Sequence, residues 1–171
     1  RLRLEKVTDH DLQTKLLADL SVMQNMVKEG LDFAKSIDSA EKKQQLDIDS
    51  MLDSICADAV DAGQQVVLSG SSQSFITAQP LTLRRGITNL IDNAVKYGQK
   101  AEIHINRETN YVAIHILDHG MGIPENQIEK VFEPFYRLEN SRSRSTGGTG
   151  LGLTIAKNVI ERNNGILKLQ N

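Results

Sequence analysis

Three short motifs, each joined to a hydrophobic run of a defined periodicity, constrain this chain more than any other feature. They are NLIDNAVKYG at 89–98, DHGMG at 118–122 and GTGLGL at 148–153. The first motif continues a stretch whose hydrophobic residues recur at helical spacing, namely Leu83, Ile87, Leu90, Ile91 and Ala94. A helix over about 80–97, with a polar edge beside its hydrophobic face, is therefore predicted.

The polar edge of this predicted helix carries Asn89, Asn93 and Lys96. Residues three and four positions apart share a helix face, so these side chains can converge on one polyphosphate and its hard cation. An asparagine pair on a helix is more often solvated surface or a local hydrogen-bonded feature. The asparagine pair indicates a binding site only together with the motifs that follow it.

The two glycine-rich motifs predict the two ends of a nucleotide site. Asp118 ends an alternating run at 111–117 that reads as a strand, and its carboxylate can accept a hydrogen bond from the amine of adenine. Gly120 and Gly122 allow a positive φ and let a flat ring approach the backbone. The segment 147–152 leads into a helical run, whose N-terminal amides suit anionic oxygens.

Each glycine motif has an ordinary explanation when it stands alone. An Asp-x-Gly-x-Gly string is more often a turn than a binding site. A glycine cluster before a helix is about as often a flexible loop as an anion cradle. The joint occurrence of the three motifs, in this order and with matching strand and helix context, favours the nucleotide site.

With a fourth motif, FEPFYR at 132–137, the sequence resembles the sensor histidine kinases of two-component systems. The four segments are similar to the N-box (89–97), the first glycine box (118–122), the F-box (132–137) and the second glycine box (148–153) of that family. The resemblance extends over nearly the whole chain and is to the osmosensor-like subfamily. It implies a Bergerat-type ATP-binding domain preceded by a dimerisation hairpin.

The resemblance also implies the ligands, which are ATP and Mg²⁺. It assigns Asn93 to Mg²⁺, Lys96 and Tyr97 to the phosphates, and Asp118 to adenine, with residues 138–147 as a lid. The full set of expected cofactor-binding residues is Asn89, Asn93, Lys96, Tyr97, Asp118, Gly120, Gly122, Phe132, Arg137, Gly148, Thr149, Gly150, Leu151 and Gly152.

The activity implied by the resemblance is transfer of the γ-phosphoryl group of ATP to a histidine and then to an aspartate of a response regulator. Two alternatives are gyrase, mismatch-repair or chaperone ATPases and anti-sigma serine kinases. Both place a glutamate four residues before the magnesium-binding asparagine, where this chain has Asn89. A non-catalytic dimerisation module is the third alternative.

The first forty residues differ in pattern from the remainder. Hydrophobic residues between 12 and 37 form the stripe expected of a helical bundle, namely Leu16, Leu20, Met23, Val27, Leu31 and Ala34. Residues 1–7 look like the tail of another helix. We therefore expect part of a dimerising helical hairpin at 1–40, forming a homodimer, and the catalytic domain at 41–171.

His10 begins the string HDLQT, which imitates the family's H-box, but Gln13 and Lys15 replace its arginine and proline. We expect His10 to be a turn residue between the two hairpin helices, and not the phosphoacceptor. By the resemblance, the phosphoacceptor lies upstream of residue 1 by roughly two helical turns. The fragment is accordingly expected to bind ATP but to phosphorylate itself poorly.

The fold predicted from these patterns is α+β, a two-layer α/β sandwich in which helices cover one face of a mixed sheet. Strands are expected at 46–48, 65–68, 74–77, 101–107, 111–117 and 165–170, and helices at 50–62, 80–97, 125–131 and 150–163. A net charge of −2 gives no sign of nucleic-acid binding. No hydrophobic run approaches the roughly 20 residues that span a bilayer. The resemblance implies a cytoplasmic domain of a bacterial inner-membrane sensor.

Overall fold

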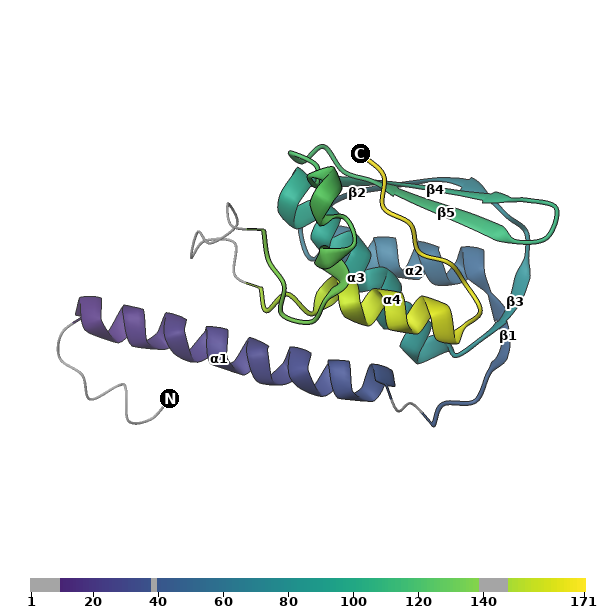
Figure 1. The fold of residues 1–171 in the computed structure, drawn as a ribbon. Coiled ribbons are helices and arrows are strands. Elements are labelled where there is room, and N and C mark those ends of the chain that lie inside the picture. The colour runs from purple at the N-terminus through teal and green to yellow at the C-terminus, as the bar shows by residue number, and fades with distance from the viewer. Residues whose placement is uncertain (1–9, 38–39, 139–147) are drawn as a thin grey trace.

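The computed structural model describes residues 10–37, 40–138 and 148–171 of the chain. Its elements are α1 (His10–Ile37), β1 (Gln44–Asp47), α2 (Ile48–Asp61), β2 (Gln65–Ser71), β3 (Phe75–Ala78), α3 (Pro80–Gly98), β4 (Lys100–Arg107), β5 (Val112–Leu117) and α4 (Gly152–Arg162). Helices α2, α3 and α4 lie against one face of a sheet, and α1 runs past α4 on the side away from the sheet (Figure 1). The predicted α+β class is confirmed.

The mixed sheet that we predicted is formed by β2, β4 and β5, and among the described residues β1 and β3 lie outside it. β2 pairs with β4 in parallel and β4 pairs with β5 antiparallel, which gives the order β2-β4-β5. β1 and β3 pair only with each other, in an antiparallel ribbon. The alternating sequence pattern predicts which residues are strands, but it does not say which backbones meet.

The core lies between the three-stranded sheet and the helices. β4 turns Ala101, Ile103 and Ile105 inward at alternate positions, as expected of a strand with one face buried. These side chains meet the hydrophobic faces of the helices, where Leu52, Ile91, Ile155 and Val159 are almost completely buried. Cys56 is also buried, and burial raises the pKa of its thiol.

The start of α2 differs from the prediction by two residues because Asp47 caps the helix. Its carboxylate accepts a hydrogen bond from the amide of Ser50 at 3.1 Å and from the Ser50 hydroxyl at 2.9 Å. An aspartate at this position satisfies an amide that the first helical turn leaves unpaired. Ile48, expected at the end of a strand, is therefore the first residue of α2.

Two further predictions fail in the part of the sequence that follows β5. Residues 165–170 form no strand, although Leu167 and Leu169 are half-buried and alternate with exposed residues. The expected helix at 125–131 consists of two separate 3-10 turns, Glu125–Gln127 and Lys130–Phe132. Backbone bonds there span three residues, as in Glu133 N to Lys130 O at 2.9 Å, so no continuous helix forms.

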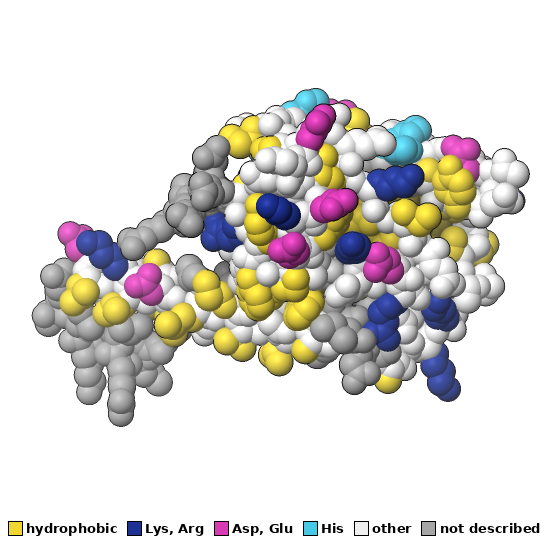
Figure 2. All heavy atoms as spheres, viewed as in Figure 1, with side chains coloured by type: hydrophobic (Ala, Val, Ile, Leu, Met, Phe, Trp, Pro, Cys, Tyr) yellow, Lys and Arg dark blue, Asp and Glu magenta, His cyan; other side chains and the backbone are white. Residues whose placement is uncertain are grey.

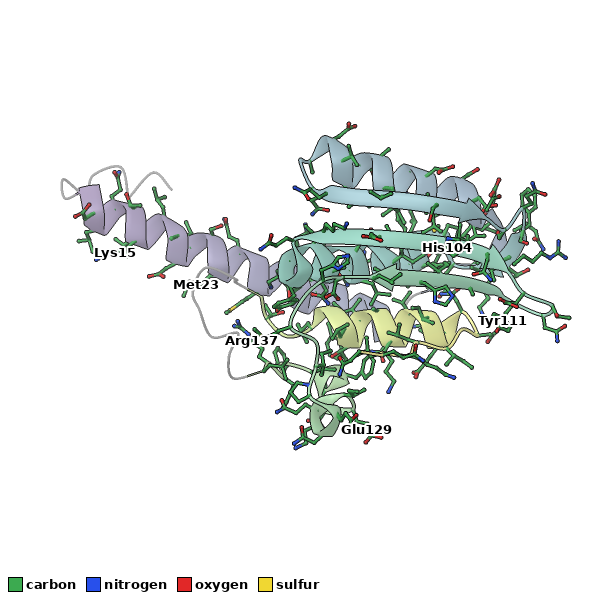
Figure 3. The ribbon with its side chains drawn as sticks, turned by 90° about the horizontal axis from the view of Figure 1, so that it is seen from above. Lys15, Met23, His104, Tyr111, Glu129 and Arg137 are labelled. Carbon is green, nitrogen blue, oxygen red and sulfur yellow. The ribbon has the colours of Figure 1, made fainter. Side chains whose placement is uncertain are left out.

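α1 is one continuous helix of 28 residues. His10 is its first residue, so the expectation that His10 lies in a turn is wrong. The C-terminal part of α1 lies beneath the domain, while the part that carries Lys15 and Met23 extends beyond it (Figures 1 and 3). Residues 1–7, expected to belong to a second helix, lie outside the described residues. Within the described residues, no helix is long and apolar enough to cross a membrane.

Asp49 organises the turn between β2 and β3. Its carboxylate accepts hydrogen bonds from the amides of Ser72, at 2.9 Å, and Gln73, at 2.6 Å, and from the Ser72 hydroxyl at 3.1 Å. Burial alone raises the pKa of Asp49, but these hydrogen bonds outweigh it and hold the pKa below its ordinary value.

We predict that Asp49→Asn lowers the free energy of unfolding at pH 7 by about 1–2 kcal/mol, because amides of the turn lose a charged acceptor. Since the pKa of the folded state is the lower one, this stabilisation is present above the unfolded value of about 3.9 and disappears as the pH falls through the folded value. Urea denaturation at pH 7 and at pH 3 measures both effects. Asp53→Asn, an exposed change on the same helix, is the control.

Candidate functional site

α3 carries the predicted asparagine pair, and its N-terminus is fixed by a distant residue. Pro80 occupies the first turn, and the N-cap residue Gln79 makes no side-chain cap. The carboxylate of Glu41 instead accepts from the amides of Leu81, at 2.8 Å, and Thr82, at 2.9 Å. Burial raises the pKa of Glu41, but its bonds to the Thr82 hydroxyl and to these amides lower it below the usual value.

The middle of α3 packs closely on α4 and brings the first and third motifs together. A Cβ on Gly86 would lie 2.8 Å from Cγ1 of Val159, so only glycine permits this approach. Farther along, the Asn93 carboxamide lies against Gly152, where an added Cβ would be 3.5 Å from Nδ2 of Asn93. Asn93 therefore lies at the N-terminal end of α4, beside amides that can receive an anion.

Asn89 lies one turn before Asn93 and is half-buried. Its Nδ2 atom is buried and has no hydrogen-bond partner among the described residues. A buried amide donor without a partner is costly, and protein side chains normally avoid it. This unpaired donor, one turn from the Asn93 carboxamide that lies at the start of α4, fits a bound polyphosphate.

The C-terminal end of α3 interlocks with the first glycine box. A Cβ on Gly98 would lie 2.6 Å from both Cβ of Asp118 and the amide nitrogen of His119. On the other side, a Cβ on Gly120 would lie 3.0 Å from the carbonyl oxygen of Tyr97. The Asp118 Oδ1 atom accepts from the Gly120 amide at 2.7 Å, which fixes the orientation of the carboxylate.

The F-box and the second glycine box also form one unit. Gly150 has a φ of +79°, and its carbonyl accepts from the amide of Phe135 at 3.1 Å. A Cβ on Gly150 would lie 2.7 Å from the carbonyl oxygen of Tyr136. The Thr154 hydroxyl donates to the carbonyl of Phe132 at 2.9 Å. The F-box thus holds the loop that leads into α4.

The remaining predicted site residues lie around these contacts. The Lys96 ammonium group lies 5.1 Å from the ring centroid of Tyr97, and that ring is partly exposed. Gly122 has a φ of +70°. Arg137 is half-buried at the end of the domain from which α1 extends (Figure 3). Of the expected lid, residues 139–147 lie outside the described residues. No group of three or more His, Cys, Asp or Glu side chains in the described part of the chain is arranged to hold a metal ion.

Sequence reasoning missed the residues that hold the motifs in place. The packing role of Gly98 has a local signal, because a glycine that ends a helix is common. No local sequence signal marks the role of Glu41, because its partners are 40 and 41 positions away. The same is true of Asn171, whose carboxamide bonds to both the amide and the carbonyl of Ile123 after the first glycine box.

We predict that Gly98→Ala weakens the binding of ADP by about tenfold or more, because the added methyl group must displace the backbone at Asp118 and His119. Isothermal titration calorimetry measures the dissociation constant, and circular dichroism checks the fold. The control is Gly30→Ala on α1, where an added Cβ meets nothing within 4 Å. Unchanged ADP binding by Gly98→Ala would show that the interlocking of α3 with this loop does not matter.

Comparison with known proteins agrees with this geometry. The family model for histidine kinase-, DNA gyrase B- and HSP90-like ATPases matches residues 78–171. The sensor histidine kinase GtrS of Pseudomonas aeruginosa is 36% identical over 171 residues, which are 100% of this chain and 35% of that protein. The sensor-like histidine kinase SenX3 of Mycolicibacterium smegmatis is 33% identical over 167 residues, or 91% of this chain and 43% of that protein.

Among solved structures, the ATP-binding domain of PrrB from Mycobacterium tuberculosis superposes with a TM-score of 0.62 at 28% identity, covering 77% of this chain and 88% of that one. The chain spans 35% of the length of GtrS. It belongs to the family of histidine kinase-, DNA gyrase B- and HSP90-like ATPases, and within that family it carries the ATP-binding domain of a two-component sensor histidine kinase.

Proposed function

We propose that this chain is the catalytic part of a sensor kinase that transfers the γ-phosphoryl group of ATP, with Mg²⁺, to a histidine, from which it passes to an aspartate of a response regulator. The observation that supports this most directly is the position of Asn93 against Gly152 at the start of α4. The carboxylate of Asp118, held in place beside the C-terminal end of α3, offers a separate partner for the adenine end of the nucleotide.

Each side chain has a defined part in binding. Oδ1 of Asp118 accepts from Gly120, so Oδ2 is the atom that we expect to accept from the amine of adenine. The amide donor of Asn89 and the first amides of α4 would receive phosphate oxygens. The carboxamide oxygen of Asn93 is a suitable ligand for Mg²⁺, which prefers oxygen and neutralises charge on the phosphates when bound.

Phosphoryl transfer of this kind needs little covalent chemistry from the protein. The γ-phosphoryl group passes in line to the acceptor, and catalysis consists mainly of positioning and charge stabilisation. A neutral imidazole is the nucleophile. The arrangement of α3 and α4 supports this role, because it holds the phosphate-binding amides and the asparagine pair on rigid helices.

The main alternative is hydrolysis of ATP, as in the gyrase and chaperone branches of the family. Such enzymes activate water with a glutamate four residues before the magnesium-binding asparagine. Asn89 occupies this position and has no basic group that can accept the proton. The names of the relatives GtrS and SenX3 also favour the kinase. The osmosensor-like subfamily and the boundary between residues 40 and 41 stay predictions.

We predict that Asn93→Ala and Asp118→Ala each weaken binding of a non-hydrolysable ATP analogue by about tenfold or more. Calorimetric titration in the presence of Mg²⁺ measures this loss. Asp92→Asn is the matched control on α3, because Asp92 is exposed and bonds to Gln64 instead of facing α4. Full binding by both alanine variants would contradict the assignment of the site. Rapid release of inorganic phosphate from ATP would favour the hydrolase instead.

We also propose that α1 mediates a homodimer, as in the bundle of two hairpins. Met23 and Val27 of its hydrophobic stripe are 63% and 65% exposed, which is unusual for large apolar side chains. Hydrophobic side chains are visible over the extended part of α1 in Figure 2. A response regulator is the expected phosphoryl acceptor, and placement in the cytoplasm beneath an inner-membrane sensor follows from the same proposal.

We predict that Val27→Asp converts the dimer to monomers, because a carboxylate in the bundle seam loses its hydration without gaining a partner. Light scattering measures the mass in solution. Lys28→Asp, at the neighbouring exposed position outside the stripe, is expected to leave the mass unchanged. A monomeric unmodified chain, or a Val27→Asp variant that remains dimeric, would contradict this seam.

A further inference from the structure

A carboxylate of α1 reaches the loop that we assign to the phosphates. The hydroxyl of Thr149, in the second glycine box, donates a hydrogen bond to Oε2 of Glu29. Thr149 is separated by two residues from Gly152, the first residue of α4, and the N-terminal end of a helix attracts anions. Glu29 therefore lies where a negatively charged ligand is expected.

Two other contacts hold α1 against the domain beside this one. Asp32, one turn after Glu29, forms an ion pair with Arg85 of α3 at 3.5 Å. Phe33 packs against the hydrophobic core. Because these contacts tether α1, the Glu29 carboxylate stays at a high effective concentration beside Thr149. A nucleotide in solution has to compete with it.

We infer that Glu29 is an intramolecular competitor of the nucleotide phosphates, so that docking of α1 on the domain and binding of the nucleotide oppose each other. This inference rests on the proposed function, since it concerns the same phosphate site. The carboxylate occupies the Thr149 hydroxyl and places a like charge near the phosphate oxygens. Movement of α1 away from α4 removes both effects and makes the site fully available.

The coupling acts in both directions. If docking of α1 lowers the affinity for the nucleotide, the nucleotide must lower the stability of the docked state by the same factor. α1 also carries the stripe that we assign to the dimer. A change in the position of α1 within a dimer would therefore alter the affinity of the domain for its nucleotide.

The test compares Glu29→Gln with the unmodified chain by calorimetric titration with ADP and with adenosine, in the presence of Mg²⁺. Glutamine keeps the shape and loses the charge. We expect ADP to bind roughly fivefold more tightly to the variant, which is the gain if the docked state holds about four-fifths of the molecules. Adenosine should bind equally to both chains, because it has no phosphate. Asp19→Asn, an exposed change on α1, should leave both constants unchanged.

The possible outcomes separate this inference from the proposed function. Equal ADP affinity of the variant and the unmodified chain, with ADP bound by both, overturns the inference alone. Absence of ADP binding in every chain overturns both the inference and the proposed function, since removal of the Glu29 charge then makes no nucleotide site available. An equal gain in affinity for adenosine overturns the inference, because the effect would then not be at the phosphates.

A second measurement does not depend on the variant. Hydrogen exchange of the α1 amides at 26–34 should become faster when ADP is added to the unmodified chain, because the nucleotide displaces the docked helix. Exchange that is unchanged or slower on ADP binding would show that α1 stays docked, and would overturn the inference.

Asp32→Asn, which weakens the tether to Arg85, should give a smaller gain in ADP affinity than Glu29→Gln.

Discussion

The close contact between α3 and α4 determines the rest of this structure. It is possible because Gly86 presents no side chain to Val159, which is completely buried. With the helix axes this near to each other, the Asn93 carboxamide reaches the first residue of α4. Each helix alone supplies only part of the phosphate site that we propose. The backbone amides would come from α4, and the carboxamides from α3.

Glycines have two separate uses in this domain. Gly122 and Gly150 both have a positive φ, which lets the loops at these positions turn sharply. Gly98 and Gly120 serve instead as contact surfaces, because α3 and the Asp118 loop touch backbone to backbone. The second use fixes the position of the Asp118 loop relative to α3.

The segment before the domain is attached to the same helix that carries the asparagine pair. Glu41 caps the N-terminus of α3, and Asp32 of α1 pairs with Arg85 one turn farther along. Glu29 contacts the loop before α4. Three acidic side chains thus join α1 and its connection to the two helices of the site. Any displacement of α1 acts on these contacts first, which gives the nucleotide site a direct physical link to the helix that we assign to dimerisation.

Local patterns predicted most of the secondary structure. The 3.6-residue periodicity of 80–97 and the alternation at 101–107 and 111–117 each produced an element within one or two residues of its observed bounds. Besides His10, which begins α1 instead of lying in a turn, the failures lie at 125–131 and 165–170, where the pattern was short. In the second case the alternation of buried and exposed residues is present, but the segment forms no ladder with a neighbouring strand.

The sequence by itself determined the type of each long element and the chemistry of the four motifs, because periodicity and residue type are local properties. It also led to the prediction that Asn93, Asp118 and Gly152 share one site, although only through the order of the motifs and their resemblance to a family. The tertiary structure alone decided the pairing of β1 with β3, the capping of α3 by Glu41 and the contact of Glu29 with Thr149. These contacts join residues 28 to 120 positions apart, and no local pattern records which distant groups the packed core will bring together.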